Sequence, residues 1–433
     1  MTTKHVAQPP SAVSRPLTGI RVLDLTQVAV GPYTTLMLAR MGAEIIKVES
    51  AKRPDTSRGA TVPKDHQLHL YPGRAPGEEP WNRKGDFMQR NRNKLGITLD
   101  LNAPQGKTLF KQVASLSDIV VENFRAAVME RQGLSHETLH EVNPTLIYLK
   151  LSAQGNTGPE RNYGSLGYTM ECLGGLASIT GYLDGRPRMS NETYPDPVAG
   201  ILAVGALMAA LRRRRKTGQG SFIDLSQREV TTCLMGDAVL DYAMNGRVQG
   251  PLGNRDRSRA PQGVYPCKEA DSWVAISVGS DEEWRGLCRA MGDRVWASDP
   301  RFADTLARWQ HQDELDPYLM QFTVQHDPYN VMHLLQAEGV PAGAVLKGRE
   351  TVADPHLAAR GWWDRQEFPI IGREYAYIGM PWQMPGAPPL PGTPAPKLGE
   401  HNQRIYCDLL GVSHKELGAL TTSGVTSTTP AWD

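Results

Sequence analysis

The sequence has few cysteines and almost no net charge. Its 433 residues include only five cysteines, and no two of them form a Cys-x-x-Cys pair. This pattern argues against a disulfide framework and a thiolate zinc site, and it fits a reducing cytoplasm. The formal net charge of +1 provides no field that would attract nucleic acid or a membrane surface. We therefore expect a cytoplasmic protein with neither of these partners.

Long hydrophobic runs are also missing. The longest apolar stretch, residues 198–211, is too short to span a bilayer and ends in four arginines. Residues 1–16 are polar and lack the apolar core of a signal peptide, so we expect a disordered leader.

Several motifs of common enzymes are absent. No Gly-x-Gly-x-x-Gly follows the first predicted strand, and there is no phosphate-binding loop and no Gly-x-Ser-x-Gly elbow. These absences disfavour dinucleotide binding, nucleotide hydrolysis and serine-hydrolase chemistry. His136 and His140 have the spacing of metal ligands, but no third ligand accompanies them, so we predict no metal site.

Alternating strand and helix patterns are present. Apolar strand-like segments occur at residues 21–25, 45–49, 97–101, 118–122 and 146–151, with helix-like segments between most of them. This order predicts an α/β fold with a parallel, Rossmann-like sheet. Residues 50–86 are rich in proline, glycine and charge and predict a long surface loop.

These patterns divide the chain into five segments. We predict a leader (1–16), a large Rossmann-like domain (17–225), a linker helix and loop (226–262), a small α/β domain (263–350) and a returning segment that packs on the large domain (351–433). The proline-dense stretch 380–397 is expected to run in extended form over another domain or subunit.

One carboxylate stands out for chemistry. Asp196-Pro197 precedes an apolar run that predicts a buried helix over residues 197–211. Asp is favoured as a helix N-cap and Pro at the first helical position, and capping amides would keep this carboxylate ionised. An ionised, oriented carboxylate is what a nucleophile requires. Taken alone, the local sequence favours a plain N-cap over a catalytic role.

An ordered set of segments resembles one family. Gly19–Thr26, Gly31-Pro32, Gly42–Glu49, Asn91–Asp100, Ser117–Phe124, Gly174-Gly175, Asp196-x-x-x-Gly200, Asp299–Phe302 and Gly339–Gly343 occur in the order typical of class III CoA-transferases, such as formyl-CoA, carnitine and benzylsuccinate CoA-transferases. The resemblance extends from about residue 16 to residue 410. It implies an interlocked homodimer, with coenzyme A as substrate and no resident cofactor.

The resemblance gives Asp196 a role. In this family the catalytic Asp attacks an acyl-CoA thioester to form a mixed anhydride, and the released CoA then forms an aspartyl-CoA thioester. An acceptor carboxylate completes the transfer. We expect succinyl-CoA or another dicarboxylic acyl-CoA as the donor.

The family's remaining positions carry over residue by residue. The CoA contacts fall on Val28, Ala29, Val30, Leu99, Asn102, Asn123, Phe124, Arg125 and Arg131. Positions assigned to substrate or to a closing loop are Glu171, Asn254, Arg255 and Gly263. Arg255, together with Arg186 and Arg188, is a candidate for pairing with a second substrate carboxylate, and plain surface charge is the alternative. Ala29 and Ser50 depart from the formyl-CoA transferase pattern, which has Gln and Arg there.

Two alternatives remain from the sequence. Acyl-CoA racemases of this fold use a His where this chain has Leu166, and leucine cannot transfer a proton, which disfavours racemisation. Glu171 keeps an isomerase possible as a substitute acid or base. The third hypothesis is a catalytically silent acyl-CoA-binding subunit that pairs with an active paralogue in a hetero-oligomer.

Overall fold

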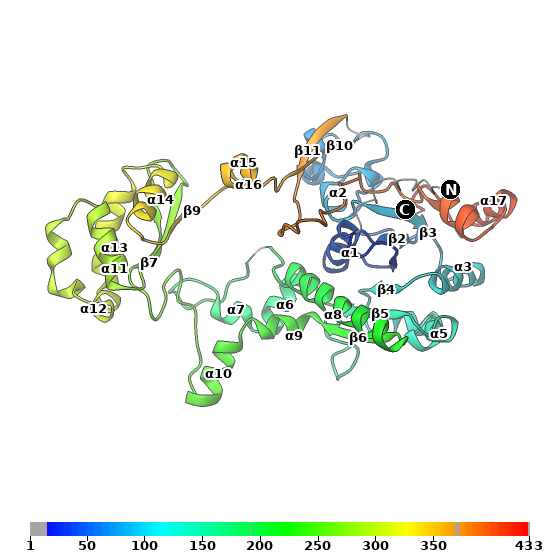
Figure 1. Cartoon of the computed structure of the whole chain (residues 1–433), viewed down its shortest axis with the longest axis horizontal. Helices are drawn as coiled ribbons and strands as arrows, with labels where there is room; N and C mark the ends of the chain where they lie inside the picture. The colour runs from blue at the N-terminus through cyan, green and yellow to red at the C-terminus, as the bar shows by residue number, and fades with distance from the viewer. Residues whose placement is uncertain (1–14, 191, 369–371, 432–433) are drawn as a thin grey trace, which may run out of the picture. The chain divides into compact units, whose positions relative to one another are not determined.

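A computed structural model describes residues 15–190, 192–368 and 372–431, and the chain forms two compact units (Figure 1). The first unit comprises residues 15–176, 190–236 and 358–431 within the described ranges, and the second comprises 177–189 and 237–357. Most of the predicted leader lies outside the described residues.

A six-stranded parallel sheet forms the centre of the first unit. Its order is β3-β2-β1-β4-β5-β6, and every neighbouring pair is parallel. The strands are β1 (Arg21–Asp24), β2 (Glu44–Glu49), β3 (Lys94–Thr98), β4 (Ile119–Glu122), β5 (Ile147–Ser152) and β6 (Ser221–Ser226). The predicted parallel α/β architecture is confirmed, and this strand order is that of doubly wound sheets.

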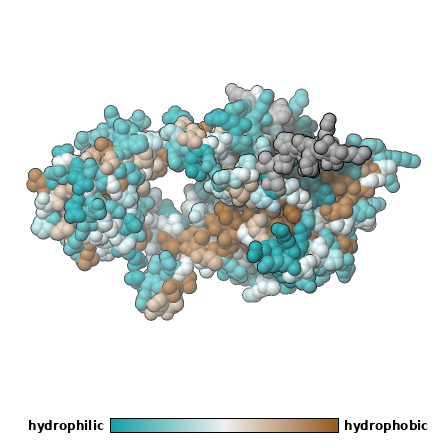
Figure 2. Space-filling model, viewed as in Figure 1, coloured by the Kyte–Doolittle hydropathy of each residue, from teal (hydrophilic) through white to brown (hydrophobic). Residues whose placement is uncertain are grey.

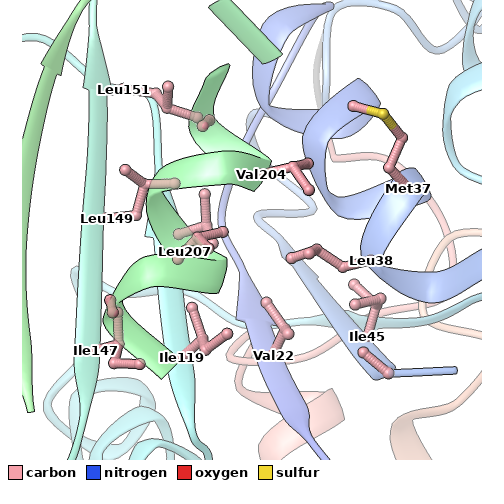
Figure 3. Close-up of a cluster of buried hydrophobic side chains, with 14 of the residues drawn as sticks. Val22, Met37, Leu38, Ile45, Ile119, Ile147, Leu149, Leu151, Val204 and Leu207 are labelled. Atoms are coloured by element: carbon pink, nitrogen blue, oxygen red, sulfur yellow. The ribbon is translucent and has the colours of Figure 1, made fainter. Parts of the chain in front are cut away.

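Alternating side chains place a hydrophobic core on each face of the sheet. Val22 and Ile45 point into a cluster that contains α1 (Val30–Arg40) and α8 (Pro195–Thr217), as Figure 3 shows. Leu23 and Ile46 belong to the opposite cluster, with α3 (Pro104–Ser115) and α5 (His136–Val142). Strands whose apolar side chains point to both faces are expected when helices cover both faces of a parallel sheet.

Shorter elements complete the first unit. The helices are α2 (Gly85–Arg90), α4 (Val128–Arg131), α6 (Gly167–Leu173), α9 (Gln227–Cys233) and α17 (His414–Thr422), with a π-helical turn at Arg404–Leu409. A hairpin of β10 (Asp364–Phe368) and β11 (Arg373–Tyr377) was not predicted. Helix α7 (Leu176–Ile179) begins at the boundary between the units.

Helix α8 starts earlier than the sequence suggested. Its first residue is Pro195 and its N-cap is Tyr194, so the prediction that Asp196 caps the helix is wrong. Two prolines flank Asp196, and Pro195 takes the first helical position. Among the described residues α8 alone is long and apolar enough to pass as a membrane span by length and composition. Ala203 and Leu207 are fully buried in the core, which accounts for that composition.

The second unit contains an antiparallel sheet of β7 (Gln262–Pro266), β8 (Trp273–Ser277) and β9 (Ala342–Ala344) in that order. Its helices are α10 (Gly236–Asn245, the first residue belonging to the other unit), α11 (Asp281–Ala290), α12 (Thr305–Gln310), α13 (Gln312–Thr323), α14 (Pro328–Ala337), α15 (Gly348–Ala353) and α16 (Pro355–Ala359, whose last two residues return to the first unit). Its core is formed by residues such as Val274, Leu287 and Phe302.

Residues 50–86 are only partly a surface loop. Asp55 and Arg58 are buried and pair with charged residues of β2, and the rest forms short 3-10 turns at Asp65–Leu70, Pro72–Arg74 and Pro80–Asn82. This burial could not be predicted from the composition, because the segment is rich in polar and charged residues. The proline-dense stretch 380–397 runs without regular structure along the first unit, where the Leu390 amide donates to the Arg40 carbonyl at 2.7 Å.

Candidate active site

A pocket of about 460 Å³ opens at the carboxyl ends of the first four strands. Its lining comes from segments that directly follow these strands: Leu25 and Gln27 after β1, Val48–Arg53 around the end of β2, Leu99–Asn102 after β3, and Phe124–Gln132 after β4. The strand order reverses between β1 and β4, and such switch points are where open α/β sheets bind ligands.

Three of the nine predicted CoA contacts line this pocket, and the other six do not. Leu99, Asn102 and Phe124 line it. The Asn123 side chain ties the pocket to the turn after β1, because its Oδ1 accepts from the Gln27 amide at 2.9 Å and its Nδ2 donates to the Gln27 carbonyl at 2.8 Å. Arg125 and Arg131 are exposed on the segment after β4, where their charges are accessible to a phosphate group.

Val28, Ala29 and Val30 form the turn between β1 and α1. Val28 has a φ of 68°, a left-handed conformation that is rare for a β-branched residue. Its amide donates to Asp55 Oδ1 at 3.0 Å, and Lys47 Nζ lies 3.0 Å from Asp55 Oδ2. Burial opposes ionisation of Asp55, but Lys47 and backbone amides lower its pKa to about 2. A buried ion pair therefore holds this turn in its strained shape.

Asp196 lies in the first turn of α8 and is 8% exposed. Burial raises the pKa of its carboxyl from 3.8 to about 6, against the opposing effects of Arg90 and of a hydrogen bond with the Thr193 side chain. The expectation that capping amides lower this pKa is wrong, since no side-chain cap bond is made at this helix start. At pH 7 about nine-tenths of the carboxyl is nevertheless ionised.

Close packing joins the start of α8 to the start of α1. Thr34 Oγ1 donates to the Val30 carbonyl at 2.8 Å and lies 3.3 Å from the Gly200 carbonyl oxygen. A Cβ on Gly200 would stand 3.0 Å from the Tyr33 ring, which is a tight contact that the small glycine avoids. Gly200 ends the Asp-x-x-x-Gly pattern, one helical turn after Asp196, and its contact with Val30 packs the start of α8 against the turn that follows β1.

Gly167 faces Asp196 from helix α6. A Cβ on Gly167 would stand 3.2 Å from Asp196 Oδ2 and 2.6 Å from Thr193 Cβ. The preceding residue, Leu166, is the exposed N-cap of α6. Glu171 is buried on the same helix, and Ser190 occupies its two oxygens, donating from the amide at 2.8 Å and from the hydroxyl at 2.5 Å.

The remaining predicted positions belong to the second unit. Arg255 donates to Asp313 at 2.6 Å and to Asp316 at 3.0 Å, so its guanidinium is engaged within its own unit. Asn254 is exposed, and Gly263 lies in β7. Among the described residues, no group of three His, Cys, Asp or Glu side chains is arranged to hold a metal ion.

Sequence reasoning missed two parts of the site. Arg53 lines the pocket, and the rule that ligands bind beyond the carboxyl ends of parallel strands would have indicated it, since it follows β2. Arg90 acts electrostatically on Asp196 although 106 positions separate them in sequence. No local pattern signals that proximity.

The parallel sheet and the pocket at its switch point define a ligand-binding α/β protein, and comparison with known proteins narrows the class. The sequence profile of CoA-transferase family III matches residues 17–402. The chain is 34% identical over 412 residues to the succinyl-CoA–D-citramalate CoA-transferase of Chloroflexus aurantiacus, covering 94% of this chain and 97% of that one. It is 32% identical to the succinate–glutarate CoA-transferase of Agrobacterium fabrum, covering 91% and 96%.

A solved structure has the same fold. A CAIB/BAIF family protein from Brucella suis superposes with a TM-score of 0.80 at 28% identity, covering 92% of this chain and all of the other. The chain belongs to CoA-transferase family III, and it is an enzyme of the CoA-transferase class.

Proposed function

We propose that the enzyme moves CoA from succinyl-CoA, or another dicarboxylic acyl-CoA, to a carboxylic acid, with Asp196 as the nucleophile. The observation that carries this proposal is the position of Asp196, a buried carboxylate in the first turn of α8, whose start packs against the turn that follows β1. The matched relatives that transfer CoA between succinate and citramalate or glutarate support the substrate class.

The proposed mechanism passes through two kinds of covalent intermediate on Asp196, a mixed anhydride and a CoA thioester. An Asp196 oxygen attacks the thioester carbonyl. The C–S bond breaks, CoA leaves as a thiolate, and the acyl group stays on Asp196 as a mixed anhydride. The thiolate attacks the Asp196 carbonyl and releases the free acid, which carries away one Asp196 oxygen. An acceptor carboxylate then attacks the aspartyl-CoA thioester and forms a second mixed anhydride, releasing the CoA thiolate. The thiolate attacks the acceptor's acyl carbonyl, which gives the new acyl-CoA and frees the Asp196 carboxylate. No separate base is needed, because the carboxylate is already ionised at neutral pH.

Mass spectrometry tests this proposal. The protein is incubated with succinyl-CoA without an acceptor, and the Asp196 peptide is examined for a CoA thioester. We expect the adduct in the wild type and its absence in Asp196→Asn. Full transfer activity in that variant would refute the proposal.

The same experiment separates the two alternatives. Exchange of the donor's α-hydrogen with solvent deuterium, without an acceptor, would indicate an isomerase. Leu166 counts against this chemistry, because it stands next to Gly167 at the Asp196 carboxylate and offers no proton carrier. Binding of CoA esters without any adduct until a second protein is added would indicate a silent subunit.

We further propose an interlocked homodimer in the cytoplasm. Helices α6 and α8 leave Tyr168, Tyr194, Ile201 and Leu202 each at least 41% exposed, and Figure 2 shows apolar residues gathered over this part of the first unit. A contiguous apolar face of this kind is typical of an interface. All five cysteines are free, which fits a reducing compartment. A monomer at micromolar concentration in sedimentation equilibrium would refute the dimer.

A further inference from the structure

Arg90 contacts the turn between β1 and α1. It is the last residue of α2, and its Nη1 donates to the carbonyl oxygen of Val28 at 3.3 Å. A Cβ on Gly200, one helical turn after Asp196, would stand 3.2 Å from the Val30 carbonyl oxygen, so the start of α8 packs on the same turn as Arg90. The positive charge of Arg90 also opposes the rise in the pKa of Asp196. Arg90 is therefore adjacent to the position where Asp196 would meet an acyl thioester.

Arg90 makes no ion pair among the described residues, unlike neighbouring arginines. Arg92 and Arg40 both pair with Asp364, and Arg58 pairs with Glu49. Over residues 15–190, 192–368 and 372–431, no ion pair connects Arg90 to an acidic side chain. Its side chain is partly exposed, which leaves guanidinium donors available to a ligand.

A dicarboxylic acyl group brings a second negative charge close to Asp196. In succinyl-CoA two methylene groups separate this carboxylate from the thioester carbonyl that Asp196 would attack. Without a cation the two carboxylates would repel each other. A guanidinium with free donors is suited to bind such a carboxylate through two parallel hydrogen bonds.

We propose that Arg90 binds the terminal carboxylate of the acyl group and so selects dicarboxylic acyl-CoA donors. This inference rests on the proposed transfer through Asp196. It assigns the specificity to a residue on α2 rather than to Arg255, whose guanidinium already bonds Asp313 and Asp316.

The test compares two donors that differ at one end. Succinyl-CoA and butyryl-CoA have acyl chains of equal length, and only the first has the terminal carboxylate. Single-turnover formation of the CoA adduct is measured for the wild type, Arg90→Gln and Arg90→Lys. We expect Arg90→Gln to lower the succinyl-to-butyryl rate ratio by about 10- to 100-fold, the scale of losing charged hydrogen bonds, and Arg90→Lys to restore part of it.

Arg74→Gln is the matched control, because Arg74 is an exposed arginine of the preceding segment, and it should leave both rates unchanged. Retained butyryl transfer shows that the Arg90 variant is folded. If both donors slow equally, or neither does, the inference is overturned and the transfer mechanism stands. If the wild type forms no adduct with either donor, the proposed function fails and this inference fails with it.

Discussion

Replacing Asp196 by Asn should stabilise the folded protein while abolishing CoA transfer. Burial raises the pKa of Asp196 from 3.8 to about 6, which means that the folded state disfavours the charged carboxylate. One pKa unit corresponds to about 1.4 kcal/mol, so ionisation costs the folded state about 3 kcal/mol. Asparagine has nearly the same shape and never carries this charge.

The stability gain should depend on pH in a defined direction. The folded-state pKa lies above the unfolded one, so the protonated carboxyl imposes no penalty below pH 3.8, and the penalty is complete above about pH 6. The difference in unfolding free energy between variant and wild type should therefore be largest at pH 7–8 and about half as large at pH 5.

Urea unfolding at several pH values measures this difference, with catalysis followed in parallel. The wild-type rate of adduct formation should fall as the pH drops through about 6, because Asp196 is then protonated. Equal stability of Asn variant and wild type at every pH would refute the buried, charged carboxylate. A stability gain of this kind is the expected signature of a site that sacrifices stability for activity.

Three further predictions concern the surroundings of Asp196 and the pocket. Gly167→Ala should slow adduct formation by about 100-fold, because its methyl group would crowd Thr193 and displace the nucleophile; unchanged rates in the mass-spectrometric assay would contradict this geometry. Asp55→Asn should destabilise the protein by about 3 kcal/mol or more, because Lys47 would be left buried without its partner, and the urea midpoint reports this loss. Phe124→Ala should weaken binding of free CoA by roughly tenfold or more, the scale of losing an aromatic surface, and titration calorimetry that detects no change would remove Phe124 from the site.

The sequence predicted the regular parts of the fold well. Residues 45–49 and 118–122 were expected as strands and form β2 and β4, and one of the helix-like segments expected between the strands forms α3. These segments carry apolar patterns that a sheet covered on both faces requires. The positions of Leu99 and Phe124 at one pocket also follow from the chain order, because parallel strands end at the same edge.

Contacts between residues far apart in the chain could not be predicted from the sequence. The pairing of Lys47 with Asp55 puts a polar segment in the interior, whereas composition alone predicts a surface loop. The pKa of Asp196 depends on burial by elements distant in sequence, and the local Asp-Pro pattern predicted the opposite shift. Arg90 acts on Asp196 only because α2 and α8 both pack against α1 in the folded unit.

The return of the chain to β3 determines when the sheet of the first unit is completed during synthesis. Strand β3 is an outer strand of the sheet, and residues near the C-terminus cover it: the Gly96 amide donates to His401 Nδ1 at 3.1 Å, and the Thr98 amide donates to Asn402 Oδ1 at 2.9 Å. During synthesis on the ribosome, these residues emerge about 300 positions after β3. The edge strand β3 therefore stays uncovered in the nascent chain while the whole second unit is translated. During this interval the nascent chain depends most on chaperones.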